Sequence, residues 1–248
     1  MCLKALVALF NLTFNTDSKL EVLNAIFVYA QKTGQSSQVA HLTKKYDDWV
    51  LAWNMSIEQQ RELLKSLALI LKDSGESAQA LTTMINFFKT FKGTGNYPKD
   101  VEDLISATLL SAIKSPISAF SDRVALLESL NTSSFGEPLA SLAKLLQIIS
   151  DGSLSDFTEF KAKSSSIFKT YDLDVEQMNQ QMRLLSLCSL AASSADKTLS
   201  FDAITAACEC TDDMDVEIWV IEAISQVRGD RINTSSVCIS KRIYILCI

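Results

Sequence analysis

The side chains best suited to metal or nucleophilic chemistry are few in this chain, and their spacing suits neither. The 248 residues include one histidine, His41, and six cysteines. Two cysteines lie close together, in Cys208-Glu209-Cys210, but they lack the two-residue spacer of zinc and redox pairs. His41 precedes Lys44-Lys45 on a predicted helix without a nucleophile signature, so we interpret it as a surface or groove histidine. We therefore predict no metal site and no catalytic residue.

An acidic cluster, Asp212, Asp213 and Asp215, has the residue type that cations prefer. A calcium-binding loop also needs a glycine and a glutamate at fixed spacing, and neither is present here. Aspartates beside the start of a helix are explained equally well by capping and by the helix dipole. We assign the cluster to the start of a predicted helix over residues 214–227.

The motifs that carry common enzyme chemistry are absent from the chain. There is no phosphate loop, dinucleotide fingerprint or nucleophile elbow, so we predict a protein that is not an enzyme and binds no cofactor. Lysine and arginine together number 23 against 29 acidic residues, a balance that gives no overall attraction to nucleic acid. The cysteines form no disulfide-like framework, which favours a reducing, cytoplasmic setting.

The apolar segments of the sequence argue against a membrane protein. No apolar run approaches the ~18 residues that a membrane-spanning helix needs. The opening residues 1–14 form a short apolar run that is interrupted by Asn11, and no small-residue cleavage site follows. We interpret them as an amphipathic helix rather than a signal peptide.

Glycine and proline fall between segments of helical periodicity, so the chain divides into many helices with short loops. Short loops make neighbouring helices antiparallel, and we predict an α-solenoid of stacked helical hairpins, with an ordinary helical bundle as the alternative. The predicted helices are 17–33 paired with 36–53, 56–73 with 77–92, and 100–114 with 121–130, then 137–150, 154–170 and one opened by Asp174.

The clearest of these helices follows Ser56. Ser56 and Gln59 match a capping box, in which each side chain satisfies a backbone amide of the first turn. Apolar residues then recur at a spacing of three and four, which predicts one buried face: Leu63, Leu64, Leu67, Ile70 and Leu71. Trp49 and Trp53 share a helix face, where we expect core packing, with an interface role as the alternative.

The last fifty residues have a different pattern. Residues 199–228 predict two short helices around an acidic turn, and the residues after Gly229 are β-branched and aromatic. This order predicts a winged-helix module with a short β-wing, and we place the domain boundary between 1–197 and 198–248. Six residues are expected to form its core: Phe201, Ile204, Val216, Trp219, Val220 and Ala223.

A winged helix that binds DNA carries lysine and arginine on its second helix. Here that helix carries acidic residues and no basic one before Arg228, and residues 199–248 hold eight acidic side chains against four basic ones. We therefore favour protein docking over DNA binding. A sheet edge can pair with a strand of a partner, and the expected docking residues are Val237, Ile239, Ile243 and Ile245.

A helical array that ends in an acidic winged helix resembles the PCI-domain proteins, which are scaffold subunits of the proteasome lid, the signalosome and eukaryotic translation initiation factor 3. Three stretches are similar to the M-subunit family of the initiation factor. They are residues 48–56 with their paired tryptophans, residues 181–185 (QMRLL), and residues 199–204 together with 216–224.

The resemblance implies a scaffold that joins other PCI subunits through their winged helices and reaches the small ribosomal subunit through the complex. Compared with the family, we expect the amino-terminal repeats to be missing, and the residues after Arg228 depart from the family's wing. Two alternatives stay open: a PCI subunit of the signalosome or proteasome lid, and a winged-helix protein that binds nucleic acid.

Overall fold

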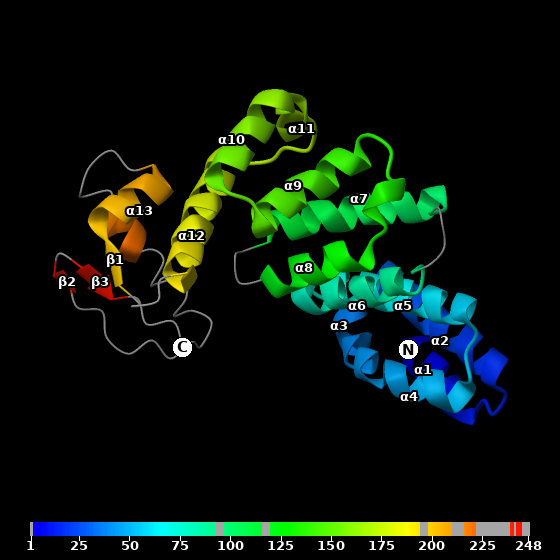
Figure 1. Cartoon of the computed structure of the whole chain (residues 1–248). Coiled ribbons are helices and arrows are strands. Elements are labelled where there is room, and N and C mark those ends of the chain that lie inside the picture. The colour runs from blue at the N-terminus through cyan, green and yellow to red at the C-terminus, as the bar shows by residue number, and fades with distance from the viewer. Residues whose placement is uncertain are drawn as a thin grey trace. The chain divides into compact units, whose positions relative to one another are not determined.

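The computed structural model describes residues 2–92, 97–115, 120–193, 198–209, 216–221, 239–240 and 242–244. These residues are mostly helical, with three short strands in the last quarter of the chain (Figure 1), and the predicted fold class, dominated by α-helix, is confirmed. The helices are α1 (Cys2–Leu12), α2 (Thr16–Lys32), α3 (Ser36–Val39), η1 (Ala40–Lys45), α4 (Tyr46–Trp53), α5 (Ile57–Asp73), α6 (Ser77–Lys89), α7 (Lys99–Lys114), α8 (Phe120–Ser129), η3 (Thr132–Ser134), α9 (Leu139–Asp151), α10 (Leu154–Lys163), α11 (Ser165–Thr170), α12 (Val175–Ser193) and α13 (Phe201–Cys208). Residues 216–221 are also helical, and the strands are β1 (Thr198–Ser200), β2 (Ile239–Ser240) and β3 (Arg242–Tyr244).

The contacts within the chain divide it into two compact units. The first comprises Met1–Val101 and Glu128–Ser134, and the second comprises Glu102–Leu127 and Phe135–Ile248. The predicted domain boundary between residues 197 and 198 lies inside the second unit and stays a prediction. Each unit is built from consecutive helices that pack on one another.

The predicted capping box starts α5 in the first unit. The Ser56 hydroxyl accepts a hydrogen bond from the Gln59 amide at 3.3 Å, and the Gln59 side chain accepts one from the Ser56 amide at 3.0 Å. The preceding helix α4 ends at Asn54, whose φ of 45° is left-handed. The left-handed residue ends α4 by satisfying a free backbone carbonyl, and the capping box begins α5 by satisfying free backbone amides. The two helices are therefore separated by only a few residues.

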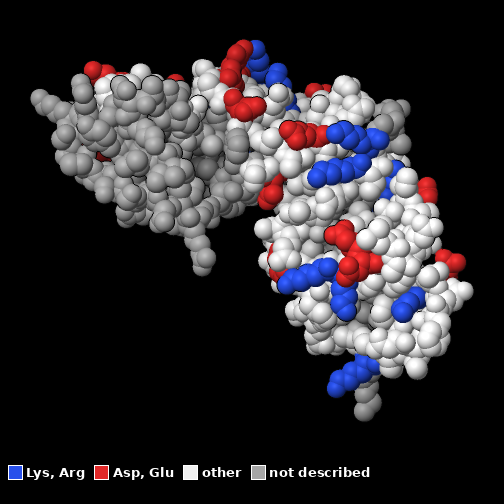
Figure 2. All heavy atoms as spheres, turned by 60° about the horizontal axis from the view of Figure 1, so that its bottom comes forward, with Lys and Arg blue, Asp and Glu red and all other residues white. Residues whose placement is uncertain are grey.

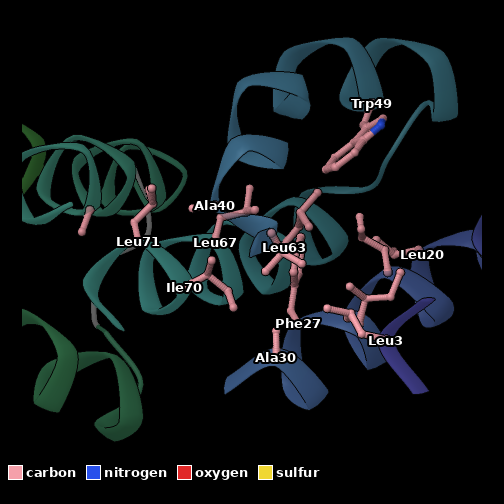
Figure 3. Packing of buried hydrophobic residues seen from close by; sticks show 14 of the residues in the cluster. Leu3, Leu20, Phe27, Ala30, Ala40, Trp49, Leu63, Leu67, Ile70 and Leu71 are labelled. Atoms are coloured by element: carbon pink, nitrogen blue, oxygen red, sulfur yellow. The ribbon is translucent and has the colours of Figure 1, made fainter. Parts of the chain in front are cut away.

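Helix α5 lies at the centre of the first unit's core. Apolar side chains from α1, α2, the α3–α4 segment and α5 converge on one another (Figure 3), and four residues of the predicted α5 stripe belong to this cluster: Leu63, Leu67, Ile70 and Leu71. The fifth, Leu64, is buried but is not part of this cluster. Phe27 and Leu63 are both fully buried there. Trp49 is also buried, and its ring stacks on Trp53 with centroids 5.5 Å apart, so the predicted packing role of the pair is confirmed.

Helices α5 and α6 are consecutive and pack against each other as a hairpin. They lie side by side in Figure 1. The Arg61 side chain of α5 binds the end of α6. Its guanidinium donates to the Thr90 hydroxyl at 3.0 Å and to the Thr90 carbonyl at 2.7 Å. The guanidinium carbon also lies 3.8 Å from the centroid of the Phe91 ring. A cation at the C-terminus of a helix donates to free carbonyls and interacts favourably with the negative end of the helix dipole. Arg61 therefore stabilises the packing of α5 on α6.

Two predicted helices are broken in the structure. Residues 36–53 form α3, the 3₁₀ segment η1 and α4, and the Thr43 hydroxyl donates to the Ala40 carbonyl at 2.8 Å within η1. Such a local bond offers the backbone an alternative to the α-helical ladder. Residues 154–170 separate at Ser164, with φ −127° and ψ 38°, into α10 and α11.

In the second unit, α9 and α10 form a hairpin with a tight turn. Gly152 ends α9, and a Cβ atom there would lie 2.7 Å from the Ile148 carbonyl oxygen, so the turn requires glycine. Ser153 and Asp156 form a second capping box that starts α10. Hydrogen bonds from the Ser153 backbone and side chain hold the pKa of the Asp156 carboxyl below its usual value.

A fully buried arginine joins three helices of the second unit. Arg123 in α8 donates to the Ala112 carbonyl of α7 at 3.1 Å, and also to the carbonyl of Ser115. Its guanidinium lies 3.4 Å from the Gln181 side-chain oxygen in α12. Burial lowers the pKa of Arg123 to about 10, which still leaves a cation at neutral pH. No local pattern indicates that this charge is buried, because its partners are carbonyls at the end of another helix.

Candidate protein-docking module

The second apolar cluster of the chain lies where α12, β1, α13 and helix 216–221 meet. Of the six residues predicted to form a winged-helix core, Ile204, Val216 and Val220 are buried in this cluster, whereas Phe201 and Trp219 are partly buried against it. The sixth, Ala223, lies outside the described residues. The cluster fixes the two helices that follow β1 against the end of α12.

Sequence reasoning missed four members of this cluster: Leu184 and Leu187 of α12, Leu199 of β1, and Cys208 of α13. The apolar spacing along α12 can be recognised in the sequence, but the elements that pack against it, β1 and α13, cannot. Leu199 lies in a strand of three residues, which is too short for an alternating pattern to identify. Cys208 is buried, and its Sγ donates to the Arg183 carbonyl at 3.7 Å.

Trp219 connects helix 216–221 to α12 through a charged group. The guanidinium carbon of Arg183 lies 5.4 Å from the centroid of the Trp219 ring, within the range of a cation–π interaction. The ring is partly buried against the cluster, so one residue provides both apolar contact and a site for the cation. This contact orients helix 216–221 relative to α12.

The three strands form one antiparallel sheet in the order β1–β3–β2. In the register, Leu199 is opposite Ile243, and Ile239 is opposite Ile243 on the other side. Described elements thus follow the sequence helix, strand, helix, helix, strand, strand. That order agrees with the winged-helix prediction, which stays a prediction.

The sheet order limits which predicted docking residues can lie at an edge. Ile239 is in the edge strand β2, but Ile243 is in the central strand β3, which has a neighbour on each side. A strand that is paired on both sides has no free backbone groups to offer a partner strand. The other two, Val237 and Ile245, lie outside the described residues, and the docking role itself stays a prediction.

The described part of the module is acidic. Asp202, Glu209 and Glu217 are exposed, and Glu217 is the one charged residue of helix 216–221. On the face of the molecule in Figure 2, basic and acidic side chains lie interspersed over the described residues and do not gather into one basic surface. Neither feature favours binding to a phosphate backbone.

Elsewhere the second unit has a groove of ≈ 590 Å³ between α9 and α10. Its lining mixes charges of both signs, and Lys163 pairs with Glu159 there. The lining residues are Glu137, Ser141, Lys144, Gln147, Ile148, Asp151, Gly152, Asp156, Glu159, Phe160, Lys163 and Ser164. They include no cysteine or histidine, and the Ser141 hydroxyl donates a hydrogen bond to the Glu137 carboxylate at 2.6 Å.

The part of the chain that the structure describes offers no cluster of metal ligands. Among those residues, no three side chains of His, Cys, Asp or Glu come together in a way that would hold a metal ion. His41 is exposed in η1. None of the described helices combines the length and apolar composition that crossing a bilayer requires.

Comparison with known proteins gives a consistent result, although no family model matches the chain. It is 28% identical over 226 residues to eukaryotic translation initiation factor 3 subunit M of Phaeosphaeria nodorum, an alignment that covers 90% of this chain and 51% of the relative. The subunit M of Aspergillus clavatus is 29% identical over 90% of this chain and 49% of its own length. That of Coccidioides immitis is 26% identical over 93% of this chain and 52% of its own length.

These relatives bear the name of one initiation-factor subunit, and they do not favour the signalosome or proteasome-lid alternative. The chain spans about half the length of the curated relatives it matches. Membership of the PCI domain class itself stays a prediction, since no family model matches. Over about nine-tenths of its own length, the chain is similar to eukaryotic translation initiation factor 3 subunit M.

Proposed function

We propose that the chain acts as a scaffold subunit of eukaryotic translation initiation factor 3, without catalytic activity of its own. The observation that carries the proposal is the similarity to subunit M, which extends over nearly the whole chain rather than over one motif. In this role the chain would bind other subunits of the factor in the cytoplasm, and would reach the small ribosomal subunit through them.

The architecture supports this proposal in physical terms. Stacked helical hairpins present long surfaces to partners. Each hairpin is stabilised mainly by its neighbours, so few residues on the outer surface are needed for folding. The module at the end of α12 adds an acidic surface and the edge strand β2. Both kinds of surface suit protein partners, and the acidic one opposes direct binding to DNA or RNA.

The test is affinity purification of the tagged chain from its own cells, followed by quantitative mass spectrometry of the proteins that it retains. We expect subunits of initiation factor 3 in constant ratio to the chain, and small-subunit ribosomal proteins that are lost when the salt concentration is raised. The matched control is Val216→Asp, which places a charge in the buried cluster and should unfold the module.

The possible results separate the alternatives. Loss of the initiation-factor subunits in the Val216→Asp control would show that the described module contributes to assembly. Recovery of signalosome or proteasome-lid subunits in place of initiation-factor subunits would overturn the proposed function while leaving the fold unchanged. Recovery of neither set by the unaltered chain would also contradict it.

A further inference from the structure

Helix 216–221 is apolar on both of its faces. Val216 and Val220 point into the buried cluster, whereas Ile218 is 58% exposed and Ile221 is 61% exposed on the other side. A surface helix of a globular protein normally carries polar residues on the face away from the core, and an all-round apolar helix is normally covered on both sides. The outer face of this helix therefore has the composition of a contact surface.

This exposed face stands out within the second unit. Among the described residues of that unit, the large apolar side chains that stay exposed are Ile218 and Ile221, and both lie on this one helix. The neighbouring helix α13 shows the usual arrangement, with Ile204 and Cys208 inside and Asp202 outside. The exposed isoleucines are thus a local feature and not a general property of the unit.

The spacing makes these residues one surface. Residues three and four apart on a helix are neighbours, so Ile218 lies beside Ile221, and Glu217 lies beside Ile221 on the same side. The surface formed by Glu217, Ile218 and Ile221, which we call the outer surface, is therefore apolar with a carboxylate at its border. A partner that covers it must offer apolar side chains to the isoleucines and a cation to the glutamate.

We propose that the outer surface is a docking site for a neighbouring protein subunit, through an apolar segment bordered by lysine or arginine. The inference rests on the proposed function, which supplies the assembly in which the partner is found. It places a contact on helix 216–221, in addition to the edge strand β2. Trp219 lies between the two isoleucines in sequence, and its ring packs against the apolar cluster and beside the Arg183 guanidinium. These contacts fix the orientation of the outer surface.

The experiment is photo-crosslinking in the assembled complex. A benzophenone amino acid replaces Ile218, Ile221 or, as a matched control, the exposed and uncharged Ala206 of α13, and each tagged chain is purified with its partners before irradiation. We expect positions 218 and 221 to crosslink to a peptide of one partner subunit that contains apolar residues beside lysine or arginine. Position 206 should give no such product.

A double variant, Ile218→Ser with Ile221→Ser, measures the contribution of the contact. Because both side chains are exposed, the fold should be retained, and hydrogen exchange of α13 checks this. Recovery of the crosslinked subunit should fall about tenfold, as expected when interface anchors are removed. Glu217→Lys should lower recovery at low salt and have little effect at high salt, where charges are screened.

Different experimental results would contradict the docking site and the proposed function. If the chain purifies with initiation-factor subunits but positions 218 and 221 crosslink to RNA, or to no protein, the docking site is wrong and the function stands. Undiminished recovery by the double serine variant would likewise contradict the docking site alone. If no initiation-factor subunit purifies with the unaltered chain, the proposed function fails and the inference fails with it.

Discussion

Replacing Trp219 with alanine tests how helix 216–221 is held against α12, β1 and α13. The ring is partly buried against the cluster formed by α12, β1, α13 and helix 216–221, and the Arg183 guanidinium lies 5.4 Å from its centroid. From the sequence alone, a buried tryptophan at this position would be expected to contribute about 3–5 kcal/mol. The structure shows partial burial, which lowers that expectation.

The magnitude follows from the two contacts. Partial burial reduces the packing contribution of the ring to roughly half the value for a fully buried aromatic residue. The lost cation–π interaction adds about 0.5–1 kcal/mol. We therefore expect Trp219→Ala to reduce the local free energy of unfolding by about 2–3.5 kcal/mol.

Hydrogen exchange measured by mass spectrometry is the suitable assay, because a chain with two compact units need not unfold in one step. Amides of α13 and helix 216–221 should exchange about 30- to 400-fold faster in the variant. Those of α5, in the first unit, should not change. The matched control Ile218→Ala, at an exposed position of the same helix, should shift stability by less than about 0.5 kcal/mol. Equal exchange in Trp219→Ala and in the unaltered chain would refute the packing argument.

Three other substitutions test the elements that position the helices. Arg123→Ala leaves carbonyls at the end of α7 without their buried donor. The free energy of unfolding, measured by urea denaturation, should fall by about 3–4 kcal/mol. A decrease below about 1 kcal/mol would contradict the argument that Arg123 joins α7, α8 and α12. Ser56→Ala removes one half of the capping box, and should cost about 1 kcal/mol, with Ser77→Ala, which removes no capping box, as the control. Gly152→Ala should cost about 1–3 kcal/mol because of the contact with the Ile148 carbonyl, and an unchanged melting temperature would show that the turn relaxes.

The parts of the fold that could be predicted are those with local causes. The start of α5 follows from Ser56 and Gln59, which contact one another, and its buried face follows from the spacing of its leucines. The break at η1 was missed, since apolar residues continue on both sides of it; within the segment the Thr43 hydroxyl bonds to the Ala40 carbonyl. Helix periodicity reports which face is buried, but it does not report a change from α to 3₁₀ geometry.

The features that could not be predicted depend on distant partners. Strand β1 has three residues, and it pairs with β3 across more than forty positions of sequence, so no local pattern identifies it. The burial of Arg123 requires carbonyls supplied by α7 and an amide from α12. In the apolar cluster of the second unit, the sequence indicated Ile204, Val216 and Val220, but it could not indicate that Ile243 lies in the central strand.

The most direct test of the proposed function is a reciprocal purification. Initiation factor 3 is isolated through a tag on another of its subunits, and the amount of this chain is measured by quantitative mass spectrometry against the other subunits. We expect the chain to be present in the same molar amount as the other subunits. Its absence from the purified factor, or its recovery in stoichiometric amount with the signalosome or the proteasome lid, would contradict the proposed function.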